Sequence, residues 1–464
     1  MTDGTRSPFD APIAEMRQMG SEVVELVTRF IDDRYSAPSA DYSGLEDLLS
    51  SLSEPPGHNG VALTELLARV ETAAGKGFDT ANPGFAAYIP GGGLYSAALA
   101  DFIACCVNRY TGIANPAPAL VQMEASVLRW LCDVFGLPST SQGVLTPGGS
   151  MANLSAIVTA RTANLGEQFL DGVMYTSEEA HHSIVKSARF AGLPSDAVRV
   201  VGTDDALRLD VEALRVAVRE DRSRGRRPFM VVASAGTINT GAVDPLAQVA
   251  AVAAEEELWF HVDGAYGAFF NLTARGRAAL DGIERADSIT LDPHKGLFLP
   301  YGTGCLLARD AGALRAAHEA HAGYLPRPSD DAGLPDFASF SPELTRDFRG
   351  LRLWLPLHLH GVGAFERALD DKLDLARFVH GELSQVSALH TPWPPELSLV
   401  AFKPRHGTNE ETEDLLRRVN SSGRVWLSSA PVRGETYVRM CILSHRSTPE
   451  RVDEAVEIIR AAAA

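Results

Sequence analysis

An aspartate and a lysine follow two apolar segments of the sequence, each at the point where the segment meets a loop. Asp263 ends the run LWFHVD (258–263), and Lys295 comes three residues after the run SITLD (288–292). In an open α/β sheet, ligands collect at the carboxyl ends of the strands. Placing two charged side chains at a buried sheet edge would cost free energy unless a ligand interacted with both. Taken one at a time, the segments also fit a buried Asp–Lys ion pair or two solvated loop charges.

An amine and a carboxylate at one sheet edge suit an aldehyde that is built on a pyridine ring. The amine forms an imine with the aldehyde, and the carboxylate keeps the ring nitrogen protonated so that the ring can accept electrons. Pyridoxal 5′-phosphate (PLP) is a cofactor of this kind. We therefore expect Lys295 to hold PLP as a Schiff base and Asp263 to pair with its pyridine nitrogen.

A phosphate group on such a cofactor needs its own site, and the sequence VLTPGGSMANL (144–154) offers one. A short strand ends in Gly148 and Gly149, and Ser150 then begins a helix. Glycines let backbone N–H groups approach an anion, and the helix turns its positive end toward it. The same pattern also fits a tight turn with a helix cap, and it is neither a Walker loop nor a dinucleotide fingerprint. It therefore indicates a phosphate site only in combination with Asp263 and Lys295.

Two histidines follow the strand VMYT (173–176). An imidazole at a strand end can stack on a flat cofactor ring and polarise a substrate carboxylate. For His182 we favour a surface position that caps the next helix. For His181 the residues alone leave stacking and capping equally open.

The elements that must position these residues show a change of pattern along the chain. An amphipathic helix is predicted near the start, and the Ser-, Pro- and Gly-rich stretch 51–60 breaks the chain. From about residue 95 to 310, short apolar strands alternate with helices. Their continuous hydrophobicity predicts strands that are buried on both faces of a mainly parallel sheet. The last ~110 residues have the pattern of a small α+β domain.

The order of these motifs resembles the group II PLP-dependent amino acid decarboxylases, which include aromatic-L-amino-acid and glutamate decarboxylases. The likeness is carried by the Gly-Gly-Ser turn, the His-x-Ser motif at 181–183, HVDGAYG (261–267) and DPHKG (292–296), and it runs over nearly the whole chain. It implies an α/β fold of type I, the aspartate aminotransferase fold, with a mainly parallel seven-stranded sheet flanked by helices and a small α+β C-terminal domain. The implied parts are an N-terminal helical segment (1–90) that packs on a dimer partner, a large PLP-binding domain (91–350) and a C-terminal domain (351–464).

The resemblance also implies roles for single residues. Lys295 would bind the cofactor covalently, Asp263 would hold the pyridine nitrogen, and His181 would stack on the ring. The remaining implied cofactor-binding residues are Gly148, Gly149, Ser150, Thr237, Ala265, Asp292 and His294.

Substrate contacts are implied in two further segments. Tyr88 and Gly91 match a substrate-pocket segment, although Gly91 stands where aromatic decarboxylases tend to carry a threonine. Ile238 likewise replaces a second threonine that they often have beside the cofactor. Tyr324 matches the tyrosine that protonates the substrate α-carbon, and the Gly-, Pro- and Asp-rich stretch after it is typical of a lid or of disorder.

The expected activity is decarboxylation of an L-amino acid, aromatic or unusually bulky, to the amine and CO2. One alternative is decarboxylation-dependent oxidative deamination to an aldehyde, or β-elimination or transamination, on a bulky amino acid of secondary metabolism. A tyrosine at position 324 favours plain decarboxylation. A second alternative, a non-catalytic binding subunit of the same fold, is opposed by the intact Asp263, Lys295 and His181. No residue names the substrate.

Composition limits the remaining possibilities. With 464 residues, two or three domains are expected. A net charge of −17 and a pI near 5.2 argue against nucleic-acid binding. No apolar run approaches the roughly 18 residues of a membrane span, and no secretory signal is visible. Five cysteines without C-x-x-C spacing predict neither a metal site nor disulfides and fit the cytoplasm. A homodimer with active sites at its interface is implied by the resemblance alone.

Overall fold

The computed structural model describes residues 7, 9–319 and 333–464. A seven-stranded sheet lies at its centre, in the order β3-β9-β8-β7-β6-β4-β5. All neighbouring strands are parallel except β9, which runs antiparallel to both β3 and β8. The strands are β3 (Gln142–Thr146), β4 (Gly172–Ser177), β5 (Val198–Val201), β6 (Arg227–Ser234), β7 (Trp259–Asp263), β8 (Ser288–Leu291) and β9 (Gly304–Ala308).

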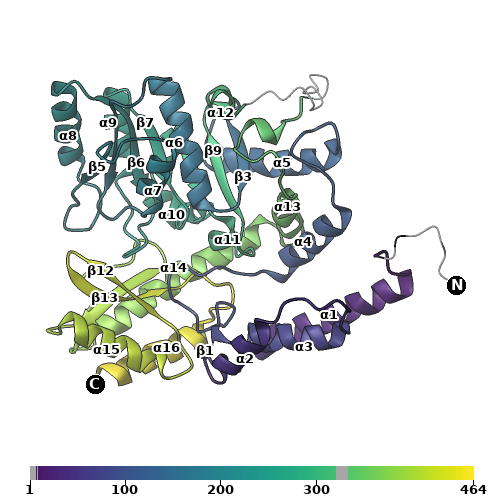
Figure 1. Ribbon diagram of the computed structural model, residues 1–464. Helices are drawn as coiled ribbons and strands as arrows, with labels where there is room; N and C mark the ends of the chain where they lie inside the picture. The colour runs from purple at the N-terminus through teal and green to yellow at the C-terminus, as the bar shows by residue number, and fades with distance from the viewer. Residues whose placement is uncertain (1–6, 8, 320–332) are drawn as a thin grey trace.

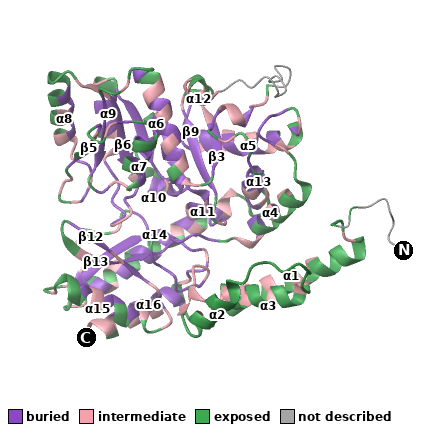
Figure 2. Ribbon diagram, in the orientation of Figure 1, coloured by how far each residue is buried: buried purple, intermediate pink, exposed green. Residues whose placement is uncertain are grey.

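Strand β6 shows why these segments are apolar without interruption. Met230 and Val232 pack into the hydrophobic cluster that α6 and α7 share with the sheet, whereas Val231 and Ala233 pack into the cluster with α8 and α9. Successive side chains of a strand point to opposite faces, so both faces of the sheet are covered, as the sequence predicted. Figure 2 shows these strands as buried.

Helices surround this sheet on both sides and at its β3 edge (Figure 1). They are α4 (Tyr95–Val107), α5 (Pro118–Val134), α6 (Gly149–Leu165), α7 (Ser183–Phe190), α8 (Val211–Ser223), α9 (Leu246–Glu255), α10 (Ala274–Ala279), α11 (Pro293–Gly296) and α12 (Ala311–His318), with 3-10 turns η1 (Ala268–Leu272), η2 (Ile283–Arg285) and η3 (Phe337–Ser339). The predicted type I fold, a mainly parallel sheet between helices, is confirmed.

The C-terminal part has a second sheet, which is antiparallel, in the order β10-β11-β13-β12. It encloses a hydrophobic cluster of its own together with α14, α15 and α16. The elements are α13 (Gly350–His360), α14 (Val362–Ser384), β10 (Leu389–His390), β11 (Leu399–Pro404), α15 (Asn409–Asn420), β12 (Ser428–Val432), β13 (Glu435–Cys441) and α16 (Pro449–Ala463). The predicted small α+β part is therefore present.

The N-terminal helices extend away from the rest of the chain (Figure 1). They are α1 (Ile13–Asp33), α2 (Leu45–Leu52) and α3 (Leu63–Ala74), with a short ladder of β1 (Ala40–Asp41) and β2 (Gly77–Phe78). None of the three helices contains a buried residue, and Figure 2 shows them as mostly exposed. Among the residues that the structure describes, no helix is both long enough and apolar enough to cross a membrane.

Candidate active site

A cavity of about 450 Å³ lies where the carboxyl ends of β6, β7 and β8 meet the start of α6. Parallel strands end at the same edge of a sheet, so residues far apart in sequence converge there. Every residue that the sequence predicted to bind the cofactor lines this cavity. These residues are Gly148, Gly149, Ser150, His181, Thr237, Asp263, Ala265, Asp292, His294 and Lys295.

Lys295 is held in the cavity wall by the carboxylate three residues before it. Its Nζ lies 2.8 Å from Oδ2 of Asp292, which is buried. The other oxygen of Asp292 is buried and has no hydrogen-bond partner among the residues that the structure describes, and Nδ1 of His294 lies 3.7 Å from it. His294 Nδ1 donates to the carbonyl of Thr303 (2.7 Å), and burial lowers the pKa of this imidazole. A short helical turn thus aims an amine at the cavity beside a carboxylate with spare acceptor capacity.

Asp263 ends β7 with a buried carboxylate that two N–H groups hold. Its Oδ1 accepts the backbone N–H of Ala265 (3.2 Å), and its Oδ2 accepts Nδ2 of Asn153 (2.9 Å). Asn153 lines the cavity from α6 and was not singled out in the sequence. It lies four residues after Gly149, so it shares a helix face with the cavity-facing first turn. That spacing was the available signal.

His181 is half-buried and lines the cavity, whereas His182 is exposed. Nδ1 of His181 accepts the backbone N–H of Ser183 (3.2 Å) and lies 2.7 Å from the Ser183 hydroxyl. Burial is the main cause that lowers the pKa of His181. His182 occupies the N-cap position of α7 without a side-chain cap bond, and its ring centre lies 4.1 Å from that of His181.

Helix α6 begins at Gly149, directly against the other cavity residues. A Cβ atom at Gly149 would lie 3.0 Å from Oδ2 of Asp292 and 3.2 Å from Cβ of Ala265. The glycine therefore permits the close approach of a helix N-terminus to the strand ends. Thr237 also lines the cavity, and its Oγ1 lies 3.2 Å from Thr240 Oγ1. Backbone donors at a helix start are suited to a phosphate group.

These groups fit PLP. Lys295 supplies an amine for the aldehyde, Asp263 a carboxylate for the ring nitrogen, and the start of α6 a set of N–H donors for the phosphate. The cavity volume also falls within the roughly 300–1,000 Å³ that is usual for cofactor pockets.

The two described residues that were predicted to contact the substrate do not line this cavity in the single chain. Tyr88 is 53% exposed and has a φ of 52°, and neither it nor Gly91 lines the cavity of the single chain, whereas Ile89 does. Their substrate roles stay predictions. Tyr324 lies outside the described residues, and its role also stays a prediction.

The glycine run beside Tyr88 packs against the backbone near Lys295. Gly92 donates its N–H to the carbonyl of His294 (3.3 Å). A Cβ atom at Gly92 would lie about 2.1–2.3 Å from backbone atoms of Phe298, and one at Gly91 would lie 2.7 Å from the ring of Tyr301. Gly93 has open space around its Cβ position but a φ of +65°. Close packing of two chain segments thus accounts for the glycine at position 92.

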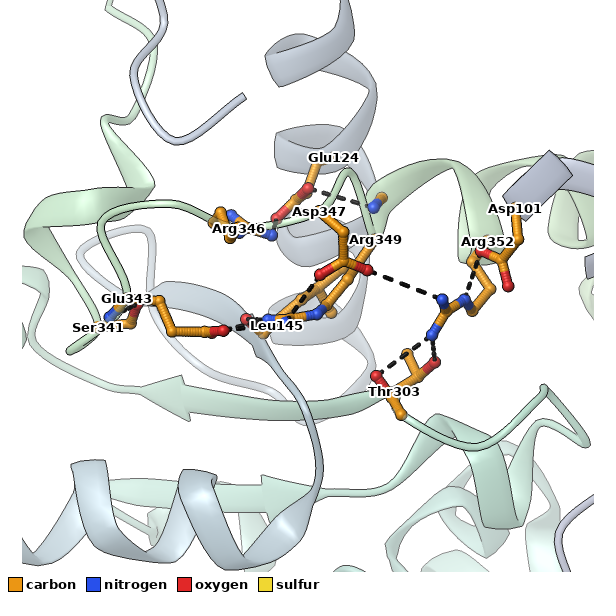
Figure 3. A network of polar contacts seen from close by, with 12 residues as sticks. Asp101, Glu124, Leu145, Thr303, Ser341, Glu343, Arg346, Asp347, Arg349 and Arg352 are labelled. Atoms are coloured by element: carbon orange, nitrogen blue, oxygen red, sulfur yellow. Dashed lines mark hydrogen bonds and ion pairs between the residues drawn. The ribbon is translucent and has the colours of Figure 1, made fainter. Parts of the chain in front are cut away.

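A buried network of charges anchors the segment that leads into α13 (Figure 3). Arg346 Nη2 donates to Glu124 Oε1, and Glu124 Oε2 accepts the N–H of Gly350 (3.2 Å). Arg349 donates to both oxygens of Glu343 (2.7 and 2.9 Å). Arg352 is linked to the cavity wall through Thr303.

Arg352 binds Asp101 Oδ1 through Nε (2.6 Å) and donates to Thr303 Oγ1 through Nη1 (2.7 Å). The carbonyl of the same Thr303 accepts the hydrogen bond from His294. The segment 341–352 is therefore tied both to α5 and to the wall of the cavity.

A mainly parallel sheet that presents a lysine, an aspartate and a helix N-terminus at its carboxyl edge defines a PLP-dependent enzyme of fold type I. The model of the pyridoxal-dependent decarboxylase conserved domain matches residues 58–405. The chain belongs to the pyridoxal-dependent decarboxylase family, and it is a PLP-dependent amino acid decarboxylase.

Known relatives match most of the length of the chain. An aromatic-L-amino-acid decarboxylase of Bacillus atrophaeus is 33% identical over 97% of this chain and 95% of its own length. A phenylacetaldehyde synthase of Arabidopsis thaliana is 29% identical over 82% of this chain and 81% of its own. The crystal structure of Oryza sativa TDC with PLP and tryptamine is 26% identical, covers 99% of both chains and has a TM-score of 0.93.

Proposed function

We propose that this enzyme decarboxylates an L-amino acid with an aromatic or other bulky side chain and releases the amine and CO2. The observation that carries the proposal is the shared cavity of Lys295 and Asp263, whose walls also include the apolar side chains of Ile89, Met151 and Ile238. An apolar wall beside the charged groups suits an apolar substrate side chain. The similarity to an aromatic-L-amino-acid decarboxylase supports the same substrate class.

Bound PLP supplies a pyridinium ring that accepts the electron pair left by departing CO2. Asp263, fixed by two N–H donors, places a negative charge where it favours a protonated ring nitrogen. His181, which lines the same cavity, would contact the ring as a neutral imidazole, because burial lowers its pKa. Lys295 would offer its amine to the aldehyde, and Asp292, 2.8 Å from Nζ, orients that amine.

The remaining proposed contacts hold the phosphate and deliver the last proton. Gly148, Gly149 and Ser150 bind the phosphate through the start of α6. Tyr324 gives a proton to the substrate α-carbon, which commits the reaction to the amine.

The alternative product is an aldehyde, which the similarity to a phenylacetaldehyde synthase keeps open. A screen of aromatic, acidic and aliphatic L-amino acids with PLP present separates the two. CO2, amine, aldehyde, ammonia and hydrogen peroxide are followed together, and the Lys295→Ala variant gives the background. We expect CO2 and amine in equal amounts from an aromatic or bulky substrate. Aldehyde with ammonia and peroxide in place of amine would overturn the proposed product, and turnover of acidic substrates alone would overturn the substrate class.

We also propose a homodimer in which the segment 1–90 packs on a second copy. In α1 the apolar residues Ile13, Met16, Val23 and Val24 are exposed, and the helix has no buried residue in the single chain. An exposed apolar face of this length is typical of a protein–protein interface. Sedimentation equilibrium should give twice the chain mass of 49.7 kDa, and a monomer at micromolar concentration would refute the dimer.

A further inference from the structure

Alternate residues of β7 point toward α6 and carry polar groups to its buried face. Trp259 packs in the same hydrophobic cluster as α6, and Asp263 bonds to Asn153 of α6. His261 lies between them at the same two-residue spacing and also contacts Asn153. His261 is completely buried. A buried histidine in mid-strand therefore lies directly behind the carboxylate that the proposed function assigns to the ring nitrogen.

A continuous chain of hydrogen bonds joins these groups, and its direction is fixed at one end. The indole of Trp259 can only donate, and its Nε1 donates to Ser288 Oγ (2.8 Å). Ser288 Oγ lies 2.8 Å from Nδ1 of His261, and Nε2 of His261 lies 3.1 Å from Oδ1 of Asn153. Asn153 Nδ2 then donates to Asp263 Oδ2 (2.9 Å).

The carboxylate of Asp263 fixes the direction of this series of hydrogen bonds at its other end. Turning the Asn153 amide around would set its carbonyl oxygen against the carboxylate of Asp263, so the amide nitrogen must face Asp263. Asn153 Oδ1 is then left as an acceptor for His261 Nε2. His261 must carry its proton on Nε2 and accept the Ser288 hydroxyl proton at Nδ1. Thr290 Oγ1 lies farther from Nε2, at 3.5 Å.

Asn153 also connects this chain to the other side of the cavity. Its second amide hydrogen points to Ser183 Oγ (3.0 Å), which lies 2.7 Å from Nδ1 of His181. Because that Nδ1 already accepts the backbone N–H of Ser183, the hydroxyl must donate to it. His181 is thus also a neutral imidazole with its proton on Nε2. One network orients both side chains that are proposed to contact the cofactor ring.

We propose that His261 is a positioning residue that acts through Asn153 to fix the orientation of the Asp263 carboxylate. This inference rests on the role that the proposed function gives to Asp263. A His261 ring with its proton on Nε2 presents the donor that locks the Asn153 amide, and only the neutral form of that ring also accepts the Ser288 hydroxyl at Nδ1. A histidine side chain alone is therefore not enough: its tautomer matters. Burial lowers the pKa of His261 to about 4, which keeps the ring neutral at physiological pH.

The test uses three variants of the whole chain. His261→Phe keeps the ring volume and removes both nitrogens. His261→Gln keeps an amide that can donate to Asn153 and accept from Ser288. Tyr175→Phe is the matched control, because it removes an equally buried hydrogen bond, from Tyr175 to Asp221 Oδ2 (3.0 Å), in the neighbouring strand β4 without touching the cavity.

Two measurements are independent of catalytic turnover. The first is the dissociation constant of PLP, obtained by titrating each apo-protein. We expect His261→Phe to weaken binding about tenfold or more, His261→Gln to stay within about threefold of the parent, and Tyr175→Phe to leave it unchanged. The second is the 15N spectrum of histidine-labelled apo-protein, in which the signal lost in His261→Gln should show a proton on Nε2 and none on Nδ1.

The outcomes separate the inference from the proposed function. Equal PLP affinity in His261→Phe and the parent, or a His261 proton on Nδ1, would overturn the positioning role while leaving the decarboxylase function intact. Failure of the parent apo-protein to bind PLP would instead overturn the proposed cofactor site. If His261→Phe does not fold, Ser288→Ala takes its place. It removes the hydroxyl that donates to Nδ1 and should weaken PLP binding, while Asn153 keeps the proton of His261 on Nε2; an unchanged PLP affinity would refute the positioning role.

Discussion

The ion pair between Arg346 and Glu124 gives the most quantitative prediction. Both side chains are 0% exposed, and the pair holds the segment before α13 against α5 (Figure 3). Arg346→Met keeps an unbranched apolar side chain but removes the guanidinium, whose carbon lies 5.0 Å from the centroid of the Phe337 ring. It leaves Glu124 buried with the N–H of Gly350 as its remaining partner. The single change therefore uncovers the cost of one buried carboxylate.

The size of that cost follows from the burial. Removing one member of a fully buried ion pair costs about 3–5 kcal/mol. Burial already raises the pKa of Glu124, and Arg346 opposes that rise. Without Arg346 the carboxyl group takes up a proton instead of remaining charged, which favours the lower end of the range. Since about 1.4 kcal/mol corresponds to a tenfold change, the segment 345–352 should open roughly a hundredfold more often.

Amide hydrogen exchange of peptides that cover 341–353 measures this local opening. The double variant Glu124→Gln/Arg346→Met should recover most of the protection, because no uncompensated charge is left buried. Arg69→Met is the surface control: Arg69 pairs with Glu65 at 47% and 52% exposure, and such pairs contribute less than about 1 kcal/mol. Exchange in Arg346→Met within threefold of the parent, or a double variant as open as the single one, would refute the reasoning.

Three other outcomes are expected. Lys295→Ala should lose both CO2 release and the visible absorbance of a lysine-linked cofactor; persistence of that absorbance would exclude Lys295 as the attachment point. Tyr324→Phe should form less amine and release aldehyde or ammonia, and an unchanged product ratio would argue against its role as the acid. His261→Gln should flatten the pH dependence of stability. The folded state keeps His261 neutral down to about pH 4, whereas the unfolded chain binds a proton near its ordinary pKa of about 6.5. The free energy of unfolding therefore falls as pH drops through this window, by up to about 1.4 kcal/mol per pH unit from this residue. Urea unfolding between these pH values measures the slope, and equal slopes in parent and variant would contradict the assignment.

The sequence predicted the strand ends well because buried parallel strands leave a strong local signal. The run that ends at Asp263 is apolar without interruption, and β7 is indeed covered on both faces. Parallel strands share a carboxyl edge, so Asp263 and Lys295 could be placed together without knowledge of their contacts. The resemblance added Thr237 and Asp292, and all four residues line one cavity.

Asn153 and His261, which position Asp263, could not be predicted in this way because their contacts depend on which helix face packs against which strand. No residue close to Asn153 in the sequence indicates why its side chain is an amide. Its partners Asp263 and His261 are more than a hundred residues away in the sequence. His261 stood inside a recognised motif but offered no sign of its neighbours on β8 and α6. The sequence also did not indicate the backbone conformation at Tyr88, which has a positive φ and an exposed side chain.

The packing of the glycine run against Phe298 limits how this enzyme can evolve. Position 92 is closed to any side chain because backbone atoms occupy the space, and a side chain at position 93 would be strained by its left-handed backbone. At position 91 the three atoms nearest to an added Cβ all belong to Tyr301, an exposed side chain that can move aside. A library that randomises the three positions should thus recover active members that differ at 91, paired with changes at Tyr301. New substrate ranges at this loop would arise through that pair of positions.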